Sequence, residues 1–86
     1  MSGRSRYSGD PAKAARLHTA RVAAGFATAR EAAQKFGWSE PRYRSNESAA
    51  RAISPVAARK YAQAFGTSPE WLLEGRNPEW MLQGRG

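Results

Sequence analysis

Two arginines and two glutamates lie within one short segment, Ser39–Glu47, and the spacing of the arginines could grip an anion or the edge of a base. Arginine carries a planar fork of N–H donors, which fits guanine O6 and N7 or the oxygens of a phosphate. If the segment is a helix, residues three and four positions apart share one side of it. Arg44 is then the best candidate for a guanine contact, while Arg42 points sideways and suits a phosphate. The face that would meet base edges comprises Glu40, Pro41, Arg44 and Ser45, continued by Ser48.

Other considerations weigh against the assignments of Glu40 and the two arginines. Glu40 could accept a hydrogen bond from cytosine N4, but repulsion from nearby phosphates would oppose that contact. Arg42 and Arg44 could simply keep an exposed helix soluble. The segment must therefore be judged together with the elements that would position it.

The residues before this segment predict a helix over 29–36. Thr28 can cap it, and Glu31 follows at the spacing of a capping box. Gly37 can end that helix, and Ser39 can cap a second one over 40–47. Two helices joined by so short a turn must cross steeply, which is the helix-turn-helix geometry that lays its second helix in the major groove of DNA.

Elsewhere the chain repeats one pattern, in which a capping residue and a proline open a helix and a glycine ends it. The pattern predicts further helices within 10–25, 54–66 and 68–75. No segment alternates apolar and polar residues as a half-buried strand would, so the expected fold is all-α and compact, with five helices. The expected core comprises Ala14, Leu17, Ala20, Ala24, Phe26, Ala32, Ala33, Phe36, Trp38, Tyr43, Val56, Ala57, Ala62 (or Ala58), Tyr61 and Phe65.

The chain repeats itself near its C-terminal end, where SPEWLLEGR (68–76) is followed by NPEWMLQGR (77–85). The expected division is a flexible basic arm over 1–9, one domain over 10–75 and an extension over 76–86 that forms a short sixth helix. Arg4 and Arg6 of the arm could touch a DNA backbone or simply be solvated. The apolar residues of the repeat either complete the core or form a dimer interface; these candidates are Trp71, Leu72, Trp80, Met81 and Leu82.

Composition narrows the possible functions. The 86 residues suit one small domain, and they carry 14 Lys+Arg against 7 Asp+Glu, a formal charge of +7. Such a charge fits nucleic acid, but a membrane-surface helix would share it, and a high-GC coding bias also favours arginine. The chain has no cysteine, no secretory signal is visible, and no stretch approaches the roughly 20 apolar residues of a membrane span. With His18 as the single histidine, we expect an intracellular binding protein, neither an enzyme nor a carrier of a metal or cofactor.

From Arg16 to Gly75 the chain resembles the lambda-repressor-like (Cro/CI, XRE) helix-turn-helix family. The matching pieces are RLHTARVAAGF, T-x-x-E-A-A-x-x-F-G-W-S, Y-R-S-N-E-S and A-x-x-Y-A-x-A-F-G-T-S-P-E-W-L-L-E-G. The resemblance implies a transcriptional regulator in the bacterial cytoplasm, most simply a repressor that binds an inverted-repeat operator on double-stranded DNA as a homodimer. It also implies an internal ion pair between Arg21 and Glu47. Expected phosphate contacts are Thr28, Arg30, Arg42, Ser48 and Arg51.

The chain departs from the family pattern at three places. Ala29 stands where glutamine often follows the cap, and Ser48-Ala49 stands where Asn-Gly is common, so a positive-φ turn there is harder to form. The chemistry of the predicted helix over 40–47, with Glu40, Pro41 and two arginines, is also unusual. An antitoxin or a small protein–protein adaptor built on the same helices is the alternative function.

Overall fold

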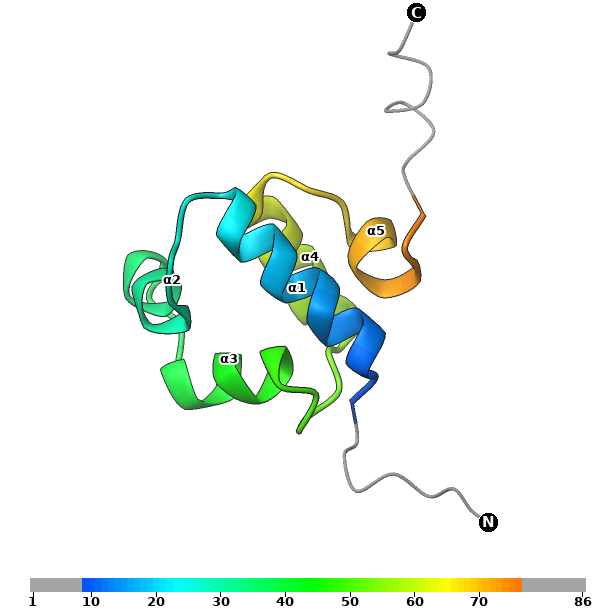
Figure 1. Ribbon diagram of the computed structural model, residues 1–86, viewed down its shortest axis with the longest axis horizontal. Coiled ribbons are helices and arrows are strands. Elements are labelled where there is room, and N and C mark those ends of the chain that lie inside the picture. Colours follow the sequence, from blue (N-terminus) through cyan, green and yellow to red (C-terminus); the bar gives the residue numbers. More distant parts are fainter. Residues whose placement is uncertain (1–8, 77–86) are drawn as a thin grey trace, which may run out of the picture.

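Five helices make up the part of the chain that the computed structural model describes, residues 9–76 (Figure 1). They are α1 (Pro11–Ala23), α2 (Ala29–Phe36), α3 (Glu40–Glu47), α4 (Pro55–Phe65) and α5 (Pro69–Glu74). These residues contain no strand, which confirms the prediction of an all-α fold. The expected sixth helix and the first eight residues of the expected arm lie outside the described residues.

Each helix begins at a side chain that accepts a hydrogen bond from the backbone of its own first turn. Thr28 Oγ1 accepts from the Glu31 amide at 3.1 Å, and Ser39 Oγ accepts from the Arg42 amide at 3.4 Å. These bonds satisfy N–H groups that have no partner within the helix. At the other end, Gly37 follows α2 with φ 72°, a left-handed conformation that glycine adopts at little cost. The remaining capping residues are Asp10, Ser54 and Ser68.

The helices form a globule in which α1 and α4 cross the centre, α2 and α3 lie to one side, and α5 lies to the other (Figure 1). Leu17 of α1, Tyr43 of α3 and Leu72 of α5 are the largest fully buried side chains. Trp38, in the turn between α2 and α3, stacks on Phe36 with ring centroids 4.8 Å apart and on Tyr43 at 5.5 Å. This aromatic packing fixes the angle at which α3 leaves α2.

The buried side of α4 differs from the prediction at one residue. Val56 was expected in the core, but it is 68% exposed. The buried residues of α4 are Ala58, Tyr61, Ala62 and Phe65, a spacing of three, four and seven positions that defines a single helical face. Val56 lies two positions before Ala58, roughly 200° around the helix, so it points to solvent.

The turn after α3 places a non-glycine residue in the left-handed region. Ala49 has φ 69° and is buried. The positive-φ turn therefore forms although alanine stands where glycine is common, and this conformation costs about 1–2 kcal/mol. The Gly9 amide donates to the Ala49 carbonyl at 3.1 Å. A Cβ on Gly9 would lie 2.8 Å from that carbonyl oxygen and 2.9 Å from the Arg51 carbonyl oxygen. Glycine is therefore required where the chain enters α1.

Candidate nucleic-acid interface

The third helix turns one side into the core and the other to solvent. Tyr43 and Asn46 lie on its inner side, with exposed fractions of 1% and 4%. Tyr43 is held there by the stacked ring of Trp38. The sequence-predicted base-contact residues all lie on the other side: Pro41 and Arg44 are exposed, and Glu40 and Ser45 are half-buried. Ser48, predicted as a phosphate contact, is exposed after the end of the helix.

Two of the predicted base-contact residues contact each other. Glu40 Oε2 lies 2.9 Å from Arg44 Nε, and the Arg44 side chain is 62% exposed. The spacing of four residues with the acidic partner first is the favourable order on a helix. The pair directs the guanidinium along the outer face of α3, so its terminal nitrogens can still present a fork to a base edge. The sequence carried this i, i+4 signal, although the prediction gave the two side chains separate roles.

The beginning of α2 lies beside the outer face of α3. Ala29, Arg44, Glu47 and Ser48 line a shallow hollow of about 300 Å³ between the two helices. The exposed Thr28 caps α2 at this end, where the helix dipole is positive and favours an anion. A phosphate near Thr28 and a base near Arg44 could therefore be contacted together. Arg30, also predicted as a phosphate contact, is exposed in the first turn of α2.

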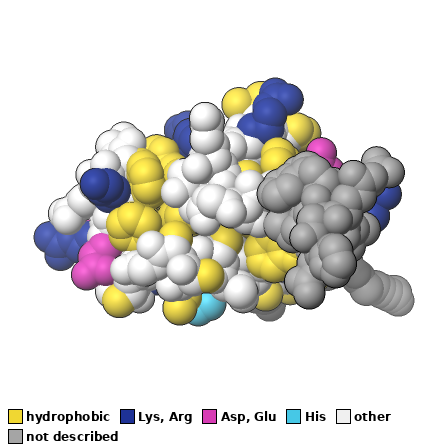
Figure 2. Space-filling model, turned by 90° about the horizontal axis from the view of Figure 1, so that it is seen from above, with side chains coloured by type: hydrophobic (Ala, Val, Ile, Leu, Met, Phe, Trp, Pro, Cys, Tyr) yellow, Lys and Arg dark blue, Asp and Glu magenta, His cyan; other side chains and the backbone are white. Residues whose placement is uncertain are grey.

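Three basic side chains meet around a groove between α3 and the start of α4. The groove has a volume of about 370 Å³, and its lining includes Arg42, Arg51 and Lys60. The first two were predicted as separate phosphate contacts. On the face turned away from α3, Figure 2 shows basic side chains that stand apart, with hydrophobic and uncharged surface between them. On the α3 side, by contrast, Arg42, Arg51 and Lys60 line a single groove.

Lys60 was missed by the sequence analysis. Its ammonium lies 5.4 Å from the centroid of the Tyr61 ring and 5.7 Å from that of the Trp38 ring, which is cation–π range. No local motif marks this lysine, because only the packing of α4 against the α2–α3 turn brings it to the groove. Its neighbour Tyr61, a predicted core residue, was the one available signal.

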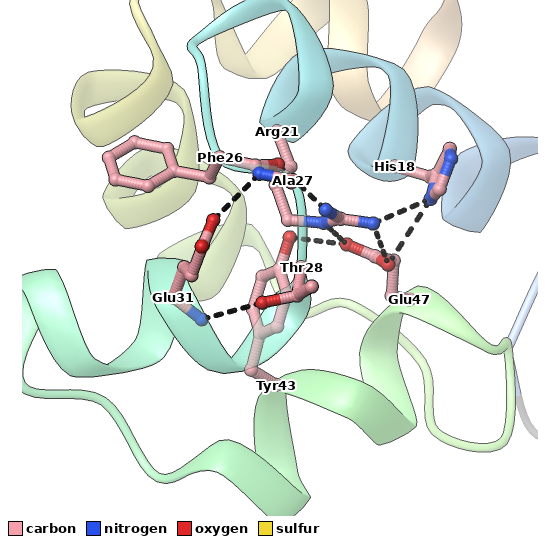
Figure 3. Close-up of polar contacts among 8 residues, drawn as sticks. All are labelled: His18, Arg21, Phe26, Ala27, Thr28, Glu31, Tyr43 and Glu47. Atoms are coloured by element: carbon pink, nitrogen blue, oxygen red, sulfur yellow. Dashed lines mark hydrogen bonds and ion pairs between the residues drawn. The ribbon is translucent and has the colours of Figure 1, made fainter.

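A buried ion cluster joins α1 to the end of α3 (Figure 3). Arg21 donates from Nε to Glu47 Oε2 at 2.8 Å and from Nη2 to Oε1 at 3.1 Å. Its Nη1 donates to the Phe26 carbonyl at 2.8 Å, and the Tyr43 hydroxyl donates to Glu47 Oε2 at 2.6 Å. His18 Nδ1 lies 3.3 Å from Glu47 Oε1 at the exposed edge of the cluster. The two residues that the family resemblance implied as an ion pair thus lie in direct contact.

The surroundings of Glu47 shift its pKa and those of its partners. Burial alone would raise the pKa of Glu47, but hydrogen bonds from Arg21, Tyr43 and His18 outweigh it and hold that pKa below its ordinary value. The hydrogen bond to Glu47 raises the pKa of Arg21. Burial, followed by the bond to the Glu47 carboxylate, raises the pKa of Tyr43 well above that of a free phenol. The cluster therefore favours an ionised Glu47 and a neutral Tyr43.

The comparison with known protein families matches the helix-turn-helix domain over residues 14–74, which is most of the chain. The chain belongs to the helix-turn-helix domain family. This membership agrees with the lambda-repressor-like resemblance, and proteins of this family are DNA-binding regulators. No curated protein and no solved structure matches the chain.

Two further features of this helix-turn-helix domain concern other kinds of function. None of its described helices is both long and apolar enough to cross a membrane. Within residues 9–76, no three histidine or carboxylate side chains gather in a way that could hold a metal ion.

The fifth helix of the domain is fixed mainly by core packing. Leu72 was a candidate for a dimer interface, but it is fully buried against α1 and α4, so it belongs to the core. Arg16 Nε donates to the Leu72 carbonyl at 3.0 Å and satisfies the end of this short helix. Trp71 packs on the core and is half-buried. The other candidates, Trp80, Met81 and Leu82, lie outside the described residues.

The domain is expected to lose stability as pH falls through the pKa of Glu47. Because this pKa is lower in the folded state than in the unfolded chain, where it is about 4.3, the unfolded state binds more protons in acid. The stabilisation is present above that unfolded value and is lost as pH falls through the lower folded value. Urea unfolding of the wild type and of Glu47→Gln, at a series of pH values between about 2 and 7, measures this. Parallel pH profiles for the two proteins would contradict the prediction.

Proposed function

We propose that this protein is a sequence-specific transcriptional regulator that acts by binding double-stranded DNA and not by catalysis. In this proposal α3 lies in the major groove and Arg44 contacts guanine, with Glu40, Pro41 and Ser45 close to the neighbouring base edges. Phosphates on either side are contacted by two groups of residues. The first group lies beside the beginning of α2 and comprises Thr28, Arg30 and Ser48. The second group lines the basic groove and comprises Arg42, Arg51 and Lys60.

One observation carries the proposal: the outward face of α3 presents a paired, oriented arginine between two features that suit phosphates. The Glu40–Arg44 pair holds the guanidinium on that face. On one side lies the beginning of α2, and on the other lies the basic groove. A helix that was merely soluble would need no such arrangement. Bases can then be contacted in the centre while phosphates fix the position of the protein on the duplex.

We further propose that the protein acts as a homodimer in the cytoplasm and represses transcription from an inverted-repeat operator. One copy contacts too few base pairs for strong selectivity, whereas two copies can read half-sites about 34 Å apart on one face of the duplex. Trp71, which is only half-buried, supports an interface that involves α5, and the apolar residues Trp80, Met81 and Leu82 would extend it. Sedimentation analysis across a concentration series tests this. A monomer, both free and on DNA, would contradict the dimer and leave DNA binding standing.

Selection from a library of random duplexes tests the proposed function. We expect a recurrent half-site, with an affinity that falls linearly on a log–log plot against salt, by about 0.9 for each neutralised phosphate. The same measurement on a scrambled duplex gives the nonspecific baseline. Binding that does not distinguish the selected from the scrambled duplex at any salt concentration would contradict the proposal. It would favour the protein–protein alternative, an antitoxin or adaptor.

A further inference from the structure

A buried amide joins three elements just behind the proposed interface. Asn46 is 4% exposed and lies on the inner side of α3 near its end. Its Nδ2 donates to the Arg51 carbonyl and to the Ala52 carbonyl, each at 3.2 Å. Its Oδ1 accepts from the hydroxyl of Tyr61, a residue of α4, at 2.7 Å. One side chain thus holds α3, α4 and the connector between them.

The orientation of this amide follows from its partners. Two carbonyl oxygens lie at one end, and they need a donor, so that end must be the nitrogen. A hydroxyl lies at the other end and can donate to the oxygen. Asparagine meets both requirements, whereas aspartate would turn a negative oxygen toward two carbonyls and an apolar residue would leave two part-buried carbonyls and a buried hydroxyl without this partner.

The connector that Asn46 holds carries a single charged side chain, Arg51. Connectors are commonly the more mobile parts of a fold, because few contacts fix their backbone. Here the Arg51 amide also donates to the Ser45 carbonyl of α3 at 3.1 Å, so the Arg51 peptide is attached to α3 on both sides. Its exposed guanidinium lines the basic groove with Arg42 and Lys60.

We propose that Asn46 is a positioning residue for DNA binding. It fixes the backbone of Arg51 against α3, so that the Arg51 guanidinium and the outer face of α3 meet the duplex in one fixed relation. Asn46 does not touch DNA, since it is buried on the opposite side of the helix. A phosphate contact made from a preordered backbone avoids the entropy cost of ordering that backbone on binding. The inference rests on the proposed function.

A double-mutant cycle in duplex affinity tests this role. The proteins are the wild type, Asn46→Ala, Arg51→Ala and the double variant, measured by fluorescence anisotropy on the selected duplex at a temperature where circular dichroism shows all four folded. We expect Asn46→Ala to weaken binding on the order of tenfold, the loss that ordering one or two residues would cause. In the Arg51→Ala background it should cause little further loss. Preference at the base contacted by Arg44 should be retained throughout.

A purely structural role gives a different result. If Asn46→Ala merely tilted α3, it would weaken binding equally with and without Arg51, and this outcome overturns the inference while the proposed function stands. A wild type that binds no duplex overturns both. Should Asn46→Ala not fold, Tyr61→Phe removes one bond from the same amide, and a smaller loss that disappears in the Arg51→Ala background is expected. Gln63→Ala, which removes an exposed amide from α4, is the matched control and should leave affinity unchanged.

Discussion

Replacing Arg21 with alanine is expected to lower the free energy of unfolding by about 3 kcal/mol or more. The Arg21 side chain is only 5% exposed, and the Glu47 side chain is 12% exposed. Removing the guanidinium leaves a buried carboxylate and also leaves the Phe26 carbonyl without its donor. Leaving one member of a buried ion pair alone is far more costly than losing an exposed one, whose contribution is about 0–1 kcal/mol.

Urea unfolding followed by tryptophan fluorescence measures this effect. Arg59→Ala is the matched control, because Arg59 is an exposed arginine of α4, and a change within about 0.5 kcal/mol is expected there. Glu47→Ala and the double variant complete a cycle, in which the double variant should lose less than the sum of the two single losses. Equal losses for Arg21→Ala and Arg59→Ala would show that the cluster does not stabilise the fold.

Arg44→Ala is expected to abolish preference at one base pair of each half-site, a loss of about 1–3 kcal/mol in discrimination. A bidentate contact to guanine would be removed, while the phosphate contacts that position the domain would remain. Glu40→Gln should produce part of the same loss, because it weakens the ion pair that orients the Arg44 guanidinium. Competition binding against duplexes changed at single positions measures the discrimination.

Arg42→Ala is the matched control for this prediction, since it removes the other arginine of the same helix. It should weaken binding to all duplexes alike and reduce the salt slope by about one phosphate contact. An Arg44→Ala variant that also weakened all duplexes alike, with no change in preference, would place Arg44 on the backbone and not on a base.

The helices could be predicted well because their signals are local. A cap such as Thr28 or Ser39 and a stop such as Gly37 act within one helical turn, so neighbouring residues alone determine where a helix begins and ends. The inward side of α3 also followed from the position of Tyr43. Val56 was assigned wrongly because apolar character was weighed without its angular position around α4.

The relations that depend on packing were harder to predict. Lys60 reaches the groove only because α4 packs beside the α2–α3 turn, and Leu72 is buried only because α1 and α4 leave a place for it. Asn46 was overlooked, although a polar residue on the inner side of a predicted helix is itself a signal that some buried group needs a partner. The Glu40–Arg44 pair could have been predicted from its spacing alone.

The most direct test is to map the duplex onto the domain by NMR, through changes in backbone amide shifts when the selected duplex is added to labelled protein. We expect the largest changes at the beginning of α2, along the outer face of α3 and in the connector as far as Arg51. If the protein is already dimeric before the duplex is added, the amides of α5 should change little. Changes confined to α1 and α5, with α3 unaffected, would contradict the claim that α3 enters the groove.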